Sequence, residues 1–208
     1  MDQSRTKPHV WDFRNCAVVV AHPAEETLWA GGTILLHPES KWTVVAVSGK
    51  NGPVTAERFD RAMDALGASG LRGEVPDTTD HSFRAARQLQ KAILDLLPVA
   101  RFDLVITHGP WEEYTRHRNH EDVGKAVFAL WENDMLLTRQ VWRFAYEDGG
   151  GKYLPRFVPD ADQLRWLPEQ TWKRKYEILT DIYGYSPDSF EAKTTPRQES
   201  FWCFVRQR

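Results

Sequence analysis

Two short stretches of the sequence bring histidines and carboxylates close together. The first, AHPAEE, places His22 three residues before Glu25 and four before Glu26. The second, HRNH, places His117 and His120 three residues apart, which is about one turn if the segment is helical. Two imidazoles and one carboxylate are a common ligand set for catalytic zinc, which keeps its fourth position for water. Such a metal would lower the pKa of that water and polarise a carbonyl group.

The elements that must position these residues alternate between strand and helix. Continuous apolar, β-branched runs predict strands that are buried on both faces, at residues 16–22, 43–49 and 102–109. Helical spacing of apolar residues predicts helices at residues 25–36, 55–68 and 83–97, and a further one that starts near His120. This alternation predicts a Rossmann-like α/β fold, a mostly parallel sheet with helices on both faces in three layers.

Four histidines fall at the ends of two of these strands. His22 ends the first strand and His108 ends the third, and His117 and His120 follow in the loop after the third strand. Ligands of an open parallel sheet bind outside the carboxyl ends of its strands. We therefore expect these imidazoles to share one edge of the sheet with the glutamates that follow His22.

A purely structural interpretation also accounts for each stretch taken alone. Carboxylates in the first turn of a helix are favoured by the helix dipole without any metal, and Pro23 suits a first helical position. Asn119 could cap the next helix, with Glu121 and Asp122 in the first turn.

Length and composition are those of an ordinary globular protein. With 208 residues, the chain is long enough for one domain with a substantial core. We expect a single domain over residues 1–208, with an N-terminal extension at 1–15. A Gly/Pro-rich C-terminal extension at about 149–208 would hold a helix at 171–183 and a last strand at 200–206. Cys16 and Cys203 are interpreted as buried thiols.

The charge balance and the apolar runs exclude several classes of partner. A net charge of −2, from 27 basic and 29 acidic residues, argues against nucleic acid. No apolar run approaches the roughly 18 residues of a membrane span. The first residues lack the apolar segment of a secretory signal, so a cytoplasmic location is the default expectation. A phosphate-binding glycine loop and a G-x-S-x-G elbow are both missing, which argues against a nucleotide cofactor and a serine hydrolase.

The two stretches resemble the signatures of the LmbE-like or PIG-L de-N-acetylases, zinc-dependent enzymes that remove acetyl groups from N-acetylglucosamine-type sugars. The first signature of that family is A-H-P-D-D-E, followed by T-L and a G-G pair, and residues 21–32 read AHPAEETLWAGG. The second is H-x-D-H after a later strand, and residues 117–120 read HRNH. The resemblance covers residues 16 to about 135 and implies an LmbE-like three-layer fold.

The resemblance implies roles for the residues that match the motifs. His22, Glu25 and His120 match the ligands of zinc, although another divalent ion would suit the same set. His117 matches a histidine that stabilises the oxyanion or protonates the leaving amine. Glu26 matches the glutamate that closes the first motif.

Three positions depart from the family pattern. Glu25 stands in the slot of the second aspartate, the carboxylate ligand, and its extra methylene group requires a shift of the metal or the backbone. Ala24 stands where the family has its general-base aspartate, and Asn119 replaces an aspartate that orients the neighbouring histidine. Loss of a positioned base typically costs ~10²–10⁴-fold in rate. Glu26 and Glu113 are the first candidates to act as base in its place, with Glu112 as a further one.

The chain is thus expected to be a hydrolase that removes an acyl group from an N-acylated amino sugar or similar small amide. The alternative is a catalytically impaired member of the family that binds a sugar or a protein partner. Aromatic rings and guanidinium groups suit a polyol. Candidates to contact an N-acetylated sugar or glycoconjugate are Trp111, Tyr114 and Arg118 near the second motif, and Arg61 on the helix after the second strand.

Overall fold

The computed structural model describes residues 12–49, 54–76, 82–97, 101–109 and 117–206. Its strands are β1 (Asn15–Val20), β2 (Lys41–Ala46), β3 (Ala68–Arg72), β4 (Arg101–Thr107), β5 (Leu137–Phe144), β6 (Tyr146–Glu147), β7 (Arg156–Phe157), β8 (Gln163–Trp166) and β9 (Gln198–Val205). Its helices are α1 (Glu25–Leu36), α2 (Ala56–Leu66), α3 (Phe83–Leu96), α4 (Arg118–Glu132), α5 (Glu169–Glu177), the π-helical turn η1 (Ile178–Ile182) and α6 (Phe190–Thr194). Within these ranges, every helix is too short or too polar to cross a membrane.

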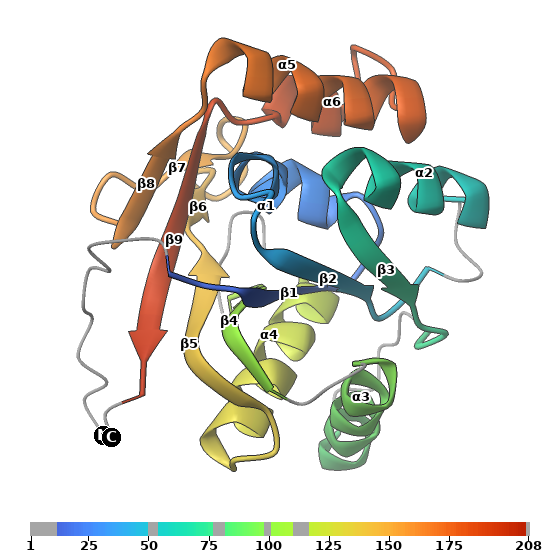
Figure 1. Cartoon of the computed structure of the whole chain (residues 1–208), viewed down its shortest axis with the longest axis vertical. Helices are drawn as coiled ribbons and strands as arrows, with labels where there is room; N and C mark the ends of the chain where they lie inside the picture. The colour runs from blue at the N-terminus through green and yellow to red at the C-terminus, as the bar shows by residue number, and fades with distance from the viewer. Residues whose placement is uncertain (1–11, 50–53, 77–81, 98–100, 110–116, 207–208) are drawn as a thin grey trace.

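The main sheet has seven strands in the order β3-β2-β1-β4-β5-β9-β8. The first five are parallel to one another, whereas β9 runs antiparallel to β5 and β8 antiparallel to β9. Figure 1 shows α1 and α2 on one side of this sheet and α3 and α4 on the other. The predicted three-layer α/β fold with a mostly parallel sheet is therefore confirmed.

Strand β1 shows why the sheet is covered on both faces. Val18 and Val20 pack into a core cluster with α1, α2 and η1, whereas the alternate residues Ala17 and Val19 pack into a second cluster with α3 and α4. Because side chains of a strand alternate between the faces, a run of apolar residues needs an apolar layer on each side.

Helix ends follow local signals in the sequence. Helix α1 has the predicted bounds. Helix α2 begins after Thr55, whose hydroxyl accepts a hydrogen bond from the backbone N–H of Arg58 at 3.3 Å. It ends at Gly67, which adopts a left-handed conformation that glycine tolerates without strain.

Several elements differ from the sequence-based expectation. Helix α4 begins at Arg118 with His117 as its N-cap, so Asn119 lies inside the helix and does not cap it. The expected helix at 171–183 is α5 followed by η1, and the last strand begins two residues earlier than expected, at Gln198. Strands β3, β5 and β8 are not predicted, because their sequences ASGLR, LTRQVWRF and QLRW mix polar with apolar residues.

A buried carboxylate joins α1 to the C-terminal part of the chain. Glu199 on β9 accepts hydrogen bonds from the backbone N–H groups of Gly32 and Thr33, each at 2.7 Å, and from the Lys175 ammonium of α5 at 2.7 Å. The side chains of Glu199 and Lys175 are both wholly buried. Such a buried ion pair adds little to the free energy of unfolding. It keeps β9 and α5 together, because a buried charge without its partner is strongly destabilising. It holds α1, whose first residue is Glu25, against the sheet.

Close packing also fixes α4 against the end of β4. A Cβ atom on Gly124 would lie 2.6 Å from the backbone oxygen of His108 and 2.8 Å from the backbone of Gly109. Backbone atoms at a strand end cannot swing away as a flexible side chain can. Glycine at position 124 therefore allows the helix that carries His120 to approach His108.

We predict that Gly124→Ala lowers the free energy of unfolding by about 1–3 kcal/mol through overpacking, although alanine favours a helix by about 1 kcal/mol. Gly31→Ala on α1 is the matched control, since its Cβ would lie 3.3 Å from Thr27 Cγ2 and 3.5 Å from Lys175 Cγ, which are longer contacts made with side chains only, so we expect a smaller loss. Urea denaturation of the metal-free chain measures both variants. Equal stability of Gly124→Ala and wild type would contradict this account of the packing.

Candidate metal centre

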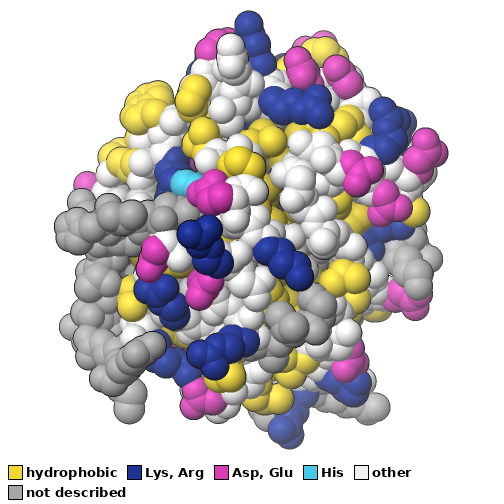
Figure 2. Space-filling view, in the orientation of Figure 1, with side chains coloured by type: hydrophobic (Ala, Val, Ile, Leu, Met, Phe, Trp, Pro, Cys, Tyr) yellow, Lys and Arg dark blue, Asp and Glu magenta, His cyan; other side chains and the backbone are white. Residues whose placement is uncertain are grey.

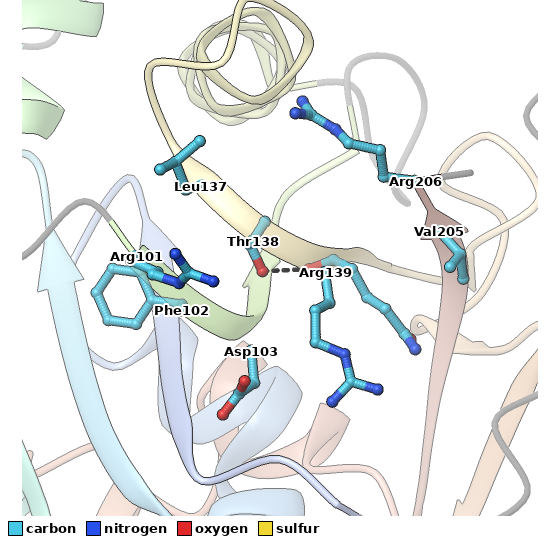
Figure 3. A pocket seen from close by; sticks show the side chains of 9 residues that line it. Arg101, Phe102, Asp103, Leu137, Thr138, Arg139, Val205 and Arg206 are labelled. Atoms are coloured by element: carbon cyan, nitrogen blue, oxygen red, sulfur yellow. Dashed lines mark hydrogen bonds between the residues drawn. The ribbon is translucent and has the colours of Figure 1, made fainter. Parts of the chain in front are cut away.

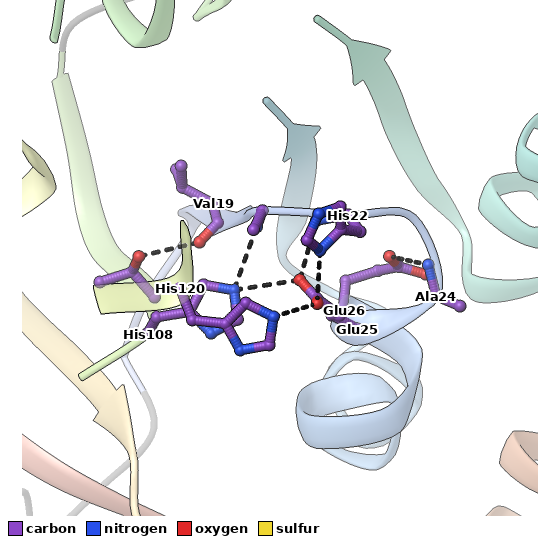
Figure 4. A network of polar contacts seen from close by, with 9 residues as sticks. Val19, His22, Ala24, Glu25, Glu26, His108 and His120 are labelled. Atoms are coloured by element: carbon purple, nitrogen blue, oxygen red, sulfur yellow. Dashed lines mark hydrogen bonds and ion pairs between the residues drawn. The ribbon is translucent and has the colours of Figure 1, made fainter. Parts of the chain in front are cut away.

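The candidate site lies at the point in the sheet where the order of the strands switches from one side of β1 to the other. From β1 the chain proceeds to β2 and β3 on one side, and then returns to β4 on the other side of β1. The carboxyl ends of β1 and β4 therefore border the crevice where parallel sheets bind ligands. His22 follows β1, His108 follows β4, and Figure 4 shows both side chains near Glu25 and His120.

The structure brings the three predicted metal ligands together. His22, Glu25 and His120 each offer one ligand atom, and these atoms all lie within 4.8 Å of one another. Glu25 Oε1 is 2.9 Å from His22 Nδ1 and 2.6 Å from His120 Nε2. The exposed fraction of the side chain is 26% for His22 but only 6% for His120, so the cluster opens to solvent on the His22 side. Two imidazole nitrogens and a carboxylate fit the donor preference of zinc.

The turn between β1 and α1 delivers Glu25 to His22. The backbone N–H of His22 donates to Glu25 Oε2 at 2.8 Å. Ala24 between them has φ 84° and ψ −20°, a left-handed conformation that is uncommon for a residue other than glycine. Aspartate and asparagine enter this region more readily than most residues. The backbone of this turn therefore suits the aspartate of the family motif as well as the alanine.

The environment of Glu25 favours its ionised form. Burial raises the pKa of this carboxyl group, but the imidazoles of His120 and His108 outweigh burial and hold the pKa well below its ordinary value. An ionised carboxylate can serve as a ligand for a cation.

Three imidazole rings form a stack at this edge of the sheet. The His120 ring lies 4.1 Å from that of His117 with an interplanar angle of 28°, and 4.3 Å from that of His108 at 23°. His117 is exposed, whereas His108 is fully buried. The stack thus runs from solvent to the core, and His120 lies in its middle.

Glu26 faces away from this cluster into a polar network of its own. Its Oε2 accepts from the backbone N–H of Ala24 at 2.9 Å, and its Oε1 accepts from the hydroxyls of Thr27 at 2.6 Å and Tyr183 at 2.7 Å. The side chain is fully buried, and burial raises the pKa of its carboxyl group. Tyr183, in the C-terminal extension, was not singled out by the sequence, because no local signal pairs it with residue 26.

Of the other predicted site residues, two lie within the described part of the chain and four lie outside it. Arg118 is exposed at the first position of α4, directly after His117. Arg61 is exposed on α2, and none of the contacts found among the described residues joins it to the centre. The predictions that fall on positions 110–116 lie outside the described residues, namely Trp111, Glu112, Glu113 and Tyr114.

A hollow of about 620 Å³ lies at the opposite edge of the sheet, lined by the first residues of β4 and β5 and the last of β9 (Figure 3). Three of its lining residues are Arg101, Arg139 and Arg206. This hollow is separate from the candidate metal centre, since it lies at the amino ends of the parallel strands.

Basic and acidic side chains are intermixed over the face of the molecule in Figure 2, in keeping with the small net charge.

Comparisons with known proteins agree with the geometry. The family model described as "GlcNAc-PI de-N-acetylase" (PIG-L) matches residues 17–131, more than half of the chain. A comparison with curated proteins finds no match.

Solved structures with the same fold include enzymes of two kinds. The 4-carboxy-2-hydroxymuconate hydratase GalB of Pseudomonas putida is similar with a TM-score of 0.63 at 17% identity, covering 94% of this chain and 98% of that one. The N,N'-diacetylchitobiose deacetylase of Pyrococcus horikoshii has a TM-score of 0.62 at 14% identity, with 93% and 85% covered. The zinc-inhibited form of teicoplanin deacetylase Orf2 has a TM-score of 0.59 at 15% identity, with 93% and 98% covered.

At these identities the solved structures establish the fold, and the family model establishes the relationship. The matched residues 17–131 include both the AHPAEE and the HRNH stretches, whose side chains meet at one edge of the sheet. The chain belongs to the GlcNAc-PI de-N-acetylase (PIG-L) family.

Proposed function

We propose that the protein is a metal-dependent hydrolase that removes the acyl group from an N-acylated amino sugar or a similar small amide. The observation that carries this proposal is the cluster of His22, Glu25 and His120 at the carboxyl ends of β1 and β4. Membership in a de-N-acetylase family, and the deacetylases among the similar structures, support amide hydrolysis as the chemistry.

In this proposal, His22, the Glu25 carboxylate and His120 would hold zinc or another divalent ion. Bound there, the ion would lower the pKa of a water molecule and polarise the amide carbonyl of the substrate. The contacts of Glu25 with both imidazoles support this assignment. The N–H of His22 holds the other carboxylate oxygen in place.

His117 is the proposed acid or oxyanion-stabilising group. Its ring is exposed and stacks on His120, so it can reach a substrate bound at the centre. The acyl oxygen would accept a hydrogen bond from its imidazole, or the leaving amine would take its proton. Trp111, Tyr114, Arg118 and Arg61 are the proposed contacts with the sugar.

Glu113 is the proposed proton acceptor, since alanine at position 24 cannot accept a proton. Glu26 and Glu112 are the other candidates, but three donors already occupy the fully buried carboxylate of Glu26. We therefore assign Glu26 a structural role at the β1–α1 turn. The alternative of an impaired member that only binds a sugar or a protein partner predicts metal binding without turnover.

Removal of the central carboxylate tests the metal site. We predict that Glu25→Gln lowers the affinity for Zn²⁺ or Co²⁺ by at least about 100-fold, because loss of an outer-shell partner alone costs 10–100-fold. Isothermal titration of the chelator-treated chain measures the affinity. Glu39→Gln is the matched control, since Glu39 also contacts a histidine, His37, at 3.0 Å but is exposed and lies outside the cluster. Similar affinities of both variants would contradict the assignment.

Restoring the family carboxylate tests the chemistry. On a panel of N-acetylated amino sugars, Ala24→Asp added to Glu113→Gln is predicted to restore the loss of about 10²–10⁴-fold in kcat/KM, the usual contribution of one positioned base. Ala24→Asn has nearly the same shape and suits the left-handed turn, but it accepts no proton, so we expect no gain from it. Measurable turnover by wild type supports hydrolysis. Turnover only in Ala24→Asp would support the impaired alternative.

Measurements of stability and of rate together distinguish Glu26 from Glu113 as the proton acceptor. Glu26→Gln places an amide N–H₂ or a single carbonyl among three donors, so we expect a loss of about 1–3 kcal/mol in the free energy of unfolding. Glu113→Gln is expected to lower kcat about 10²–10⁴-fold and leave stability unchanged. Thermal denaturation and steady-state rates measure both, and full activity of Glu113→Gln would refute its role as proton acceptor.

A further inference from the structure

His108 is a fully buried histidine at the end of β4 that the proposed mechanism does not use. Its Nε2 lies 3.0 Å from the backbone N–H of Ala21 and 3.1 Å from Glu25 Oε2. Its ring stacks on that of His120 at 4.3 Å. One imidazole therefore contacts the residue before His22 and two of the three proposed ligands. Figure 4 shows His108 beside Glu25 and His120.

The His108 ring is held firmly from its other sides. The Phe144 ring packs edge-on against it at 5.4 Å with an interplanar angle of 80°. At the preceding residue, the Thr107 hydroxyl donates to the backbone oxygen of Val19 at 2.8 Å, which ties the end of β4 to β1. On the side of α4, Gly124 lets the helix approach the backbone of His108. The ring can therefore act as a rigid support.

A metal centre built from three separate segments needs such a support. His22 comes from the end of β1, Glu25 from the first turn of α1 and His120 from α4. Ligands keep the required geometry when neighbouring groups fix their orientation, and these neighbours tune metal affinity. His108, which is not itself a proposed ligand, contacts all three segments at Ala21, Glu25 and His120.

We propose that His108 is a positioning residue of the metal centre. Its Nε2 accepts a hydrogen bond from the backbone N–H of Ala21, which fixes the ring at the end of β1. The ring then lies beside the Glu25 carboxylate and against the His120 ring, and so keeps both in the arrangement that binds the ion. This inference rests on the metal binding of the proposed function.

Two substitutions distinguish the contribution of the His108 Nε2 atom from that of its ring. His108→Phe keeps a flat ring against His120 but removes Nε2, and His108→Gln returns a polar group without the ring. Isothermal titration with Co²⁺ should give a 10–100-fold weaker affinity for His108→Phe, as for other outer-shell partners. His108→Gln should be weaker than wild type by a smaller factor. Circular dichroism of each metal-free variant checks the fold.

Phe144→Leu is the matched control, because it alters packing against the same ring without touching a polar atom. It should bind Co²⁺ within a few-fold of wild type. An unchanged affinity in His108→Phe, or a loss in Phe144→Leu as large as in His108→Phe, would overturn the positioning role. If His108→Phe does not fold, His108→Gln decides, and wild-type affinity in that variant would overturn the proposal. Failure of the wild type itself to bind Co²⁺ or Zn²⁺ would refute the proposed metal site.

Discussion

One carboxylate, that of Glu25, connects the segments that make up the candidate centre. Its two oxygens lie within 3.1 Å of the backbone N–H of His22 and of ring nitrogens of His22, His108 and His120. A buried carboxylate is costly unless positive or hydrogen-bonding groups surround it. The fold supplies these groups because β1 and β4 are neighbours in space although they are distant in sequence. The crevice at their carboxyl ends is where imidazoles from both can meet.

The rest of the structure keeps this carboxylate in place. Glu199 accepts hydrogen bonds from the N–H groups of Gly32 and Thr33, and these bonds fix the middle of α1 relative to β9. Glu26 holds the start of the same helix through the N–H of Ala24. On the opposite side, Gly124 sets the distance of α4 from β4. The geometry of the site thus depends on contacts that lie outside the ligand cluster itself.

Sequence patterns within single segments predict most of the helices and strands near the site. The apolar runs gave the parallel strands that matter for the site, and His22, Glu25 and His120 followed from the ends of those strands and the family motifs. Contacts between distant segments could not be predicted in this way. Glu199 and Gly32 are 167 residues apart, and QLRW at β8 has no apolar run to reveal a strand. His108 was placed at the correct edge, but its contact with Glu25 depends on the register of β1 and β4.

In the proposed mechanism, Ala24 separates metal binding from proton transfer, because the turn that it forms keeps the proposed ligands together while its side chain cannot act as a base. The most direct test of the central claim is the zinc K-edge X-ray absorption spectrum of the zinc-loaded protein. The account predicts nitrogen and oxygen ligands at about 2.0–2.2 Å, with outer-shell scattering from two imidazoles. A spectrum without imidazole scattering, or one dominated by sulfur at about 2.3 Å, would contradict it.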